Sequence, residues 1–185
     1  MSVATAARLP LAVDMDGTLL ETDVLAEGMR KVWRERPLGF LDALLRLAMG
    51  GRPPFKRRIA ALASLDIDAL PVRTDFLEWL RSEKANGRKL WLATAADRAT
   101  AEKVAARFDL FDGVLASDGA VNLKAGAKAR ALATHFPEGF VYAGDSAADL
   151  AVWRRAKGIV LVCAPRGVEQ RARILGATVE RVFTA

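Results

Sequence analysis

A short apolar run near the start of the chain ends in two carboxylates that lie one residue apart. Residues 9–19 read LPLAVDMDGTL, so a strand-like segment delivers Asp14 and Asp16 to a point where the backbone turns at Gly17. Alternate side chains of a strand point to the same side, and both acids would therefore face one site. Two like charges at this spacing imply a bound cation, a shared proton or both. The alternative is an acidic turn that only ends a buried strand.

The apolar pattern of the rest of the chain alternates between strand-like and helical segments. We expect strands at 9–13, 89–93, 113–116, 140–143 and 158–162, and helices at 75–86, 97–108, 124–136, 146–156 and 167–175. This order predicts an α/β fold, Rossmann-like, with a mostly parallel sheet and helices on both faces. In such sheets, ligands bind outside the carboxyl ends of the strands.

One segment interrupts this alternation directly after the paired carboxylates. Residues 22–74 contain no convincing strand and read as three helices at 24–34, 38–49 and 54–64, separated by proline and glycine. We interpret residues 22–74 as a small helical cap inserted after the first strand, and residues 1–21 and 75–185 as the core domain.

Composition limits the classes of protein that this chain can belong to. Its 185 residues, of which 52% are hydrophobic, suit one compact domain or a domain with a small insertion. No apolar stretch is long enough to span a bilayer, and the N-terminus lacks the pattern of a secretory signal. The single cysteine, Cys163, cannot form an internal disulfide. We therefore expect a cytoplasmic protein.

Positive charge is concentrated in the predicted cap. Residues 28–58 hold nine basic residues against two acidic ones, an excess larger than the net charge of +6 for the whole chain. Lys56 and Arg57 are candidate contacts to an anionic substrate, and an anionic membrane surface is a second possible partner. A solvated basic helix face is the alternative. Nucleic acid is not expected as a partner, because the basic segment has little aromatic interleaving.

Further polar residues follow the later strands. Thr94 ends the second strand with a hydroxyl that can donate to a phosphate oxygen. Lys124 lies at the start of a helix, where a cation makes sense beside anions. Asp145 and Asp149 follow the fourth strand, one helical turn apart. Taken singly, each has an ordinary alternative: a helix-entry threonine, a surface lysine, and an N-cap with an exposed acid.

Their order along the chain resembles that of the haloacid dehalogenase superfamily. The four motifs of that superfamily match Asp14 with Asp16, Thr94, Lys124, and Asp145 with Asp149. The resemblance covers nearly the whole chain, and the helical insertion is similar to the superfamily's first-position cap.

The resemblance implies a role for each acid. Asp14 would attack phosphorus and form an aspartyl-phosphate, and Asp16 would act as general acid and then as general base. It also implies Mg²⁺ as cofactor, held by Asp14, the backbone carbonyl of Asp16, Asp145 and Asp149. Hard oxygen ligands suit this ion.

The resemblance further implies a set of groups that hold the substrate. Thr94 and Lys124 would grip the phosphoryl oxygens, helped by backbone groups around Met15, Gly17 and Ala95. An aspartate at position 16 favours phosphatases and mutases within the superfamily. The expected function is therefore Mg²⁺-dependent hydrolysis of a small or lipid-linked phosphomonoester. A phosphotransferase or mutase is the alternative within the superfamily.

Several stretches together resemble a narrower group, the cytoplasmic domain found ahead of UbiA-type membrane prenyltransferases. They are residues 14–19, 92–97, 115–119, 122–124 and 142–146. This narrower resemblance implies a position at the cytoplasmic face of the membrane, with a membrane prenyltransferase as possible partner. It also leaves open a non-catalytic, regulatory domain.

Overall fold

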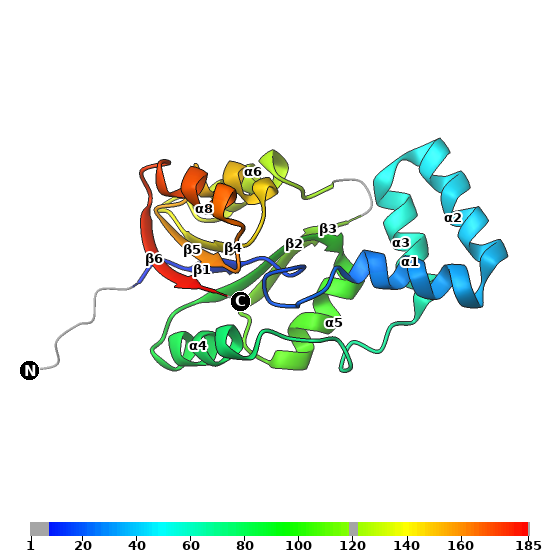
Figure 1. The fold of residues 1–185 in the computed structure, drawn as a ribbon, viewed down its shortest axis with the longest axis horizontal. Coiled ribbons are helices and arrows are strands. Elements are labelled where there is room, and N and C mark those ends of the chain that lie inside the picture. The colour runs from blue at the N-terminus through cyan, green and yellow to red at the C-terminus, as the bar shows by residue number, and fades with distance from the viewer. Residues whose placement is uncertain (1–7, 119–121, 185) are drawn as a thin grey trace, which may run out of the picture.

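The computed structural model describes residues 8–118 and 122–184 and shows a six-stranded sheet in which every pair of neighbours is parallel (Figure 1). The spatial order of the strands is β3-β2-β1-β4-β5-β6. Their bounds are β1 Leu11–Val13, β2 Leu90–Asp97, β3 Gly113–Ser117, β4 Val141–Gly144, β5 Gly158–Val162 and β6 Thr178–Phe183. The strand order reverses between β1 and β4, which is where sheets of this kind bind ligands.

Helices cover both faces of the sheet (Figure 1). One core cluster packs alternate residues of the central strands against α4 (Thr74–Ala85) and α5 (Arg98–Phe108). The other packs the intervening residues against α6 (Gly126–His135), α7 (Leu150–Trp153) and α8 (Arg166–Arg173). A 3-10 turn, η1 (Ala147–Asp149), precedes α7. The central strands are buried on both sides, as expected for a parallel sheet.

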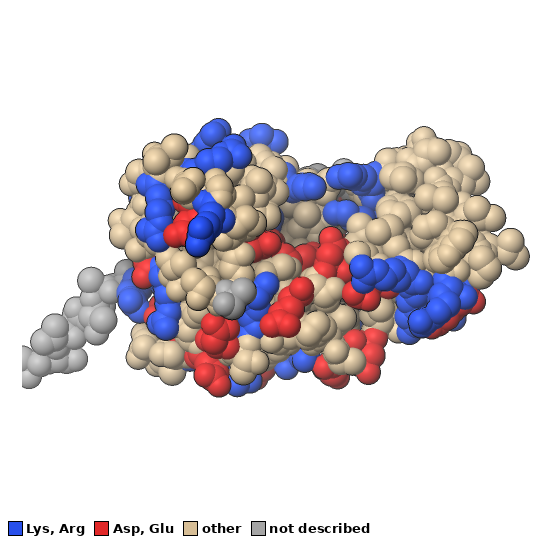
Figure 2. Space-filling view, in the orientation of Figure 1, with Lys and Arg blue, Asp and Glu red and all other residues tan. Residues whose placement is uncertain are grey.

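Three helices form a separate body after β1: α1 (Val24–Glu35), α2 (Pro37–Gly50) and α3 (Arg52–Ala63). We call these helices the cap. They pack on one another around a small core of their own, made by Val32, Ala43, Phe55, Ile59 and Ala63. Figure 1 places the cap at one end of the molecule, and Figure 2 shows a broad uncharged area over α2 and α3.

The α/β fold, the parallel sheet and the helical insertion after the first strand are confirmed. The sequence pattern missed β6, and it expected one helix at 146–156 where the structure has η1 and α7. The helix expected from residue 124 begins at Gly126. The exact domain boundaries stay a prediction. Residues 1–7 and 185 of the predicted core domain lie outside the described residues, and so does Gly119, which belongs to the narrower resemblance.

Among the residues that the structure describes, no helix is both long enough and apolar enough to cross a membrane.

Candidate active site

The topology of the sheet brings three strand ends to one place. β1 lies between β2 and β4. Asp14 follows β1, Thr94 lies in the second half of β2, and Asp145 follows β4. The Asp14 N–H donates to the Ala143 carbonyl at 3.0 Å and continues the pairing of β1 with β4. The predicted residues meet at the carboxyl edge of the sheet because the strands are parallel.

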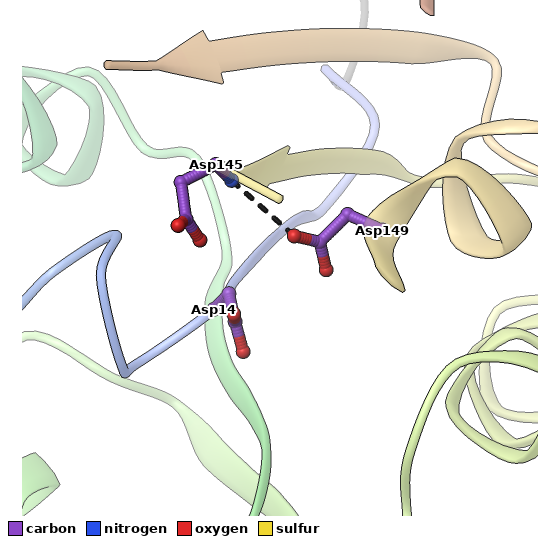
Figure 3. Close-up of side chains that lie close together, drawn as sticks. All are labelled: Asp14, Asp145 and Asp149. Atoms are coloured by element: carbon purple, nitrogen blue, oxygen red, sulfur yellow. Dashed lines mark hydrogen bonds between the residues drawn. The ribbon is translucent and has the colours of Figure 1, made fainter. Parts of the chain in front are cut away.

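Three carboxylates form a compact cluster at this edge. Asp14, Asp145 and Asp149 each offer an oxygen, and these oxygens lie within 4.8 Å of one another. Figure 3 shows Asp14 and Asp145 on neighbouring segments, with Asp149 beside them and bonded to the Asp145 N–H. On the surface, acidic side chains gather between the sheet and the cap (Figure 2). Such a set of hard oxygen donors fits a divalent cation such as Mg²⁺.

Two glycines allow this close approach. Gly17 has a φ of +79°, and a Cβ there would lie 2.5 Å from Asp145 Oδ2. At Gly144, a Cβ would lie 2.7 Å from Asp149 Cγ. A larger residue at either position would displace an acid of the cluster, so glycine lets the backbone come close to the carboxylates.

A buried lysine neutralises part of this negative charge. Lys128 Nζ donates to Asp14 Oδ1 at 2.7 Å and to the Tyr142 hydroxyl at 2.7 Å, and lies 3.9 Å from Asp149 Oδ1. Burial alone would lower the pKa of Lys128, but Asp14 and Asp149 outweigh it and raise the pKa above its ordinary value. Lys128 therefore stays protonated and holds one oxygen of Asp14 in place.

Asp149 is held by donors on both of its oxygens. The Tyr142 hydroxyl donates to Oδ1 at 2.9 Å, and the Ser146 N–H and hydroxyl donate to Oδ2 at 3.0 Å each. Asp145 accepts from the Thr18 hydroxyl at 2.9 Å through Oδ1. Asp14 and Asp145 are thus the better placed of the three to meet a metal directly, and Asp149 orients its surroundings.

Burial raises the pKa of the site acids. It raises the pKa of Asp14 to about 7 against the opposing effect of Lys128, and that of Asp16 to about 6 against a hydrogen bond from the Val24 N–H. Burial also raises the pKa of Asp145, against the hydrogen bond from Thr18. Burial and neighbouring negative charge both disfavour the charged forms of these acids, so a bound cation would favour those forms.

The Asp16 carboxylate points toward the start of the cap. Asp16 Oδ1 accepts from the Val24 N–H of α1 at 2.8 Å, and Asp16 is outside the three-acid cluster. The Gly17 carbonyl next to it accepts from Arg73 Nε at 3.0 Å. The loop after β1 is therefore tied to both ends of the insertion, and Asp16 faces the space between core and cap.

Thr94 and Ala95 lie within β2, which runs on to Asp97, so Thr94 does not end the strand as the sequence pattern predicted. The Thr94 side chain is buried, and its oxygen accepts from the Ala96 N–H at 2.9 Å, so its hydroxyl proton can go to a ligand. The Ala95 carbonyl accepts from Lys56 Nζ at 2.7 Å. Lys56 of α3 therefore reaches across from the cap to the core, and its role in binding an anion stays a prediction.

A cavity of about 610 Å³ opens in front of the acids and extends to the cap. Asp14, Asp16, Thr94, Ala95, Lys56 and Lys124 all line it. Arg57 is exposed and does not line the cavity, and Met15 is buried with its carbonyl accepting from the Leu20 N–H at 2.9 Å. Of the predicted side-chain contacts to substrate, Arg57 is the one that the structure keeps away from the cavity.

The sequence pattern did not single out Lys128, and it named Lys124 instead. Lys124 is exposed at the rim of the cavity, whereas Lys128 is buried against Asp14. A signal was present: Lys128 lies four residues before Leu132, which is buried on the inner face of α6. A lysine on that face has to find an acid in the interior.

The chain matches the family model of haloacid dehalogenase-like hydrolases over residues 11–154, a span that contains all four acids. The chain belongs to the haloacid dehalogenase-like hydrolase family. Over 173 residues it is also 39% identical to the uncharacterized protein y4nM of Sinorhizobium fredii, covering 94% of this chain. The chain spans about 33% of the length of that relative.

Solved structures agree on the fold of this hydrolase. A protein of unknown function from Bordetella pertussis has a TM-score of 0.69 at 16% identity, covering 96% of this chain and 99% of that one. A phosphoserine phosphatase with a phospho-aspartyl intermediate analogue has a TM-score of 0.66 at 16% identity, covering 97% and 95%. The solved structures show the fold, and the family model shows the broad family. They give no support to the narrower resemblance to the domain ahead of UbiA-type prenyltransferases, which stays a prediction.

Proposed function

We propose that this hydrolase is a Mg²⁺-dependent phosphatase that cleaves a phosphomonoester through an aspartyl-phosphate on Asp14. The observation that carries the proposal is the position of Asp14. It lies at the carboxyl edge of the sheet, with Lys128 on one oxygen at 2.7 Å, two further acids beside it and a cavity in front. A fixed carboxylate facing an open cavity is suited to nucleophilic attack.

The reaction divides into two steps that these residues can perform. A carboxylate oxygen of Asp14 attacks phosphorus, the bond from phosphorus to the alcohol oxygen breaks, and Asp16 gives its proton to the leaving alcohol. Water then attacks the phosphorus of the aspartyl-phosphate, and Asp16 takes a proton from that water. The bond from phosphorus to the Asp14 oxygen breaks, which releases inorganic phosphate and restores the Asp14 carboxylate. Asp16 suits both roles, because it lies outside the acid cluster and faces the space where the alcohol would lie.

The remaining groups would hold the phosphoryl oxygens. The Thr94 hydroxyl and Lys128 lie on the core side of the cavity, with Lys124 at its rim. The backbone around Met15, Gly17 and Ala95 would add N–H donors. Within this proposal, Lys128 takes the position that the sequence pattern assigned to Lys124.

Asp14, Asp145 and the backbone carbonyl of Asp16 would hold the Mg²⁺, with Asp149 orienting its shell. When bound, the ion would offset the negative charge that accumulates between the carboxylate and the phosphoryl group. The structural similarity to a phosphoserine phosphatase supports a small phosphate substrate.

The test compares the wild type with Asp14→Asn and Asp16→Asn, using an aryl phosphate with and without Mg²⁺. Asp14→Asn should lose phosphate release by a factor on the order of 10⁴ or more, as for removal of a nucleophile. Asp16→Asn should keep the first step, because an aryl leaving group needs little help from an acid. It should therefore accumulate a phosphorylated protein that acid quenching and mass spectrometry detect.

Circular dichroism checks that both variants fold. Undiminished Mg²⁺-dependent activity in Asp14→Asn would refute the nucleophile assignment. A phosphoryl group that appears on an added alcohol in place of water would favour the phosphotransferase alternative.

A further inference from the structure

The cavity in front of Asp14 has two chemically different sides. The core side presents Asp14, Asp16 and Asp149 together with Thr94 and Lys128. The cap side is lined mainly by apolar side chains of all three cap helices, among them Leu25, Met29, Phe40, Leu44, Leu47 and Phe55. A phosphoryl group bound at Asp14 would therefore leave the rest of its substrate against an apolar wall.

Part of this wall is uncovered. Phe40, Leu44 and Leu47 follow one another at spacings of four and three residues, which places them on one face of α2. Leu44 is 40% exposed and Leu47 is 36% exposed, although both line the cavity. A ligand with apolar surface would remove this area from water and gain free energy by doing so.

Charged groups on the cap side do not match an amino alcohol or an amino acid. No acid of the described helices α1–α3 lines the cavity. Asp23, just before α1, does line it, and its carboxylate accepts from the Ala26 N–H at 3.0 Å as the N-cap of that helix. The other charged groups there are Arg52 and Lys56, both cations. Asp16 and Asp97 also line the cavity, but they lie on its core side. An ammonium group placed against the cap helices would therefore meet repulsion from Arg52 and Lys56, whereas a phosphate dianion would be attracted.

We propose that this hydrolase selects phosphomonoesters of apolar alcohols, with the phosphoryl group at Asp14 and a straight-chain or aromatic alcohol against Phe40, Leu44 and Leu47. The inference rests on the proposed function, since it takes the phosphoryl position from it. A cavity of about 610 Å³ lies in the range that holds medium-sized organic ligands. The fold is shared with a phosphoserine phosphatase, but the apolar wall selects a different alcohol.

The first experiment measures kcat/KM for butyl, hexyl and octyl phosphate below their micelle concentrations, for phenyl phosphate, and for phosphoserine and phosphoethanolamine. Each added methylene that reaches the wall should raise kcat/KM by up to about fourfold. The two amino-alcohol esters should be the poorest substrates. A flat alkyl series, or a preference for phosphoserine, would overturn the proposal.

A matched pair of variants locates the effect. Leu44 and Leu45 are neighbours on α2 and both are exposed, but Leu44 lines the cavity and Leu45 does not. Leu44→Gln should flatten the chain-length dependence, whereas Leu45→Gln should leave it as in the wild type. Equal effects of the two substitutions would show that α2 does not select the alcohol through its cavity face.

Binding to the Asp14→Asn variant separates this inference from the proposed function. Titration calorimetry with the same alkyl phosphates in the presence of Mg²⁺ should give affinities that rise with chain length. If the wild type hydrolyses none of the esters, the proposed function fails, while the calorimetric series still tests the apolar wall. Affinities that do not change with chain length would show that the apolar wall does not bind the alcohol, and this result would overturn the inference whatever the activity.

Discussion

In the sheet half of the cavity, three carboxylates are held by buried donors, whereas the cap half presents apolar side chains and exposed basic groups. Asp14 is bonded to Lys128 of α6, Asp145 to Thr18 of the loop after β1, and Asp149 to Tyr142 of β4. In the cap, Leu44 and Leu47 remain partly open to solvent. Groups that perform chemistry need fixed positions, while groups that recognise an alcohol need only a matching surface.

The difference also shows in how each half is stabilised. The sheet is packed on both faces by two large clusters of buried residues, whereas the cap has a small core of its own. The two halves meet through few polar contacts, such as Lys56 with the Ala95 carbonyl and Asp16 with the Val24 N–H. A cap built in this way can change its lining without disturbing the acids.

We expect the largest effect on activity on the core side of the cavity, where Lys128 contacts Asp14 and Lys124 is exposed at the rim. Lys128→Met should lower kcat by about 10²- to 10³-fold, because it removes a fixed donor to Asp14. Lys124→Met should change kcat/KM within about fivefold, as for an exposed charge. Steady-state assays of both variants, with circular dichroism as the folding control, decide between them. A larger loss in Lys124→Met would restore the assignment made from the sequence.

A smaller effect, on the free energy of unfolding, is expected when the same substitution is made in the core of the cap and in the core of the sheet. Ile59 in the cap and Ile159 in β5 are both buried, and replacing either by Val should cost about 0.5–1.5 kcal/mol of stability. Ile59→Val should speed amide hydrogen exchange in α1–α3 only, whereas Ile159→Val should speed it across the sheet. Mass spectrometry of exchanged peptides measures both patterns. Uniform acceleration by Ile59→Val would mean that cap and sheet unfold as one unit.

The smallest effect we expect concerns Asp112, which precedes β3 at the opposite edge of the sheet. Its pKa is shifted in the opposite direction from the pKa values of the site acids. Burial alone would raise the pKa of Asp112, but hydrogen bonds from Lys84, the Leu90 N–H and Lys89 outweigh it and lower the pKa to about 2. Because the folded pKa lies below the unfolded one, Asp112 stabilises the fold above about pH 4, and this contribution is lost as the pH falls toward about 2.

Asp112→Asn should therefore lower the melting temperature near neutral pH. The loss in free energy of unfolding should be less than about 1 kcal/mol, because the ion pairs of Asp112 are partly exposed. The difference from the wild type should shrink as the pH falls through about 2, the pKa of Asp112, and approach zero below it, where the wild-type carboxyl is protonated. Thermal melts followed by circular dichroism over this pH range measure it. A difference that stays constant with pH would show that hydrogen bonding and not charge carries the effect.

The sequence by itself determined the order of strands and helices, the place of the insertion and the acids at the strand ends. These follow from local causes: the period of apolar residues specifies each element, and parallel strands place their carboxyl ends at one edge. Asp14, Thr94 and Asp145 could therefore be grouped from the strand pattern alone. The strand β6 was missed because its apolar pattern is weak, and Phe183 is the one residue of its six that is buried.

Only the tertiary structure decided which lysine donates a hydrogen bond to Asp14 and which residues line the cavity. The choice between Lys124 and Lys128 depends on where α6 begins and on which of its faces meets the sheet. Tyr142 joined the network because β4 turns it toward Lys128 and Asp149. The apolar wall arises from faces of three helices brought together, and no single helix contains it. Contacts between distant segments depend on packing geometry, which local patterns do not encode.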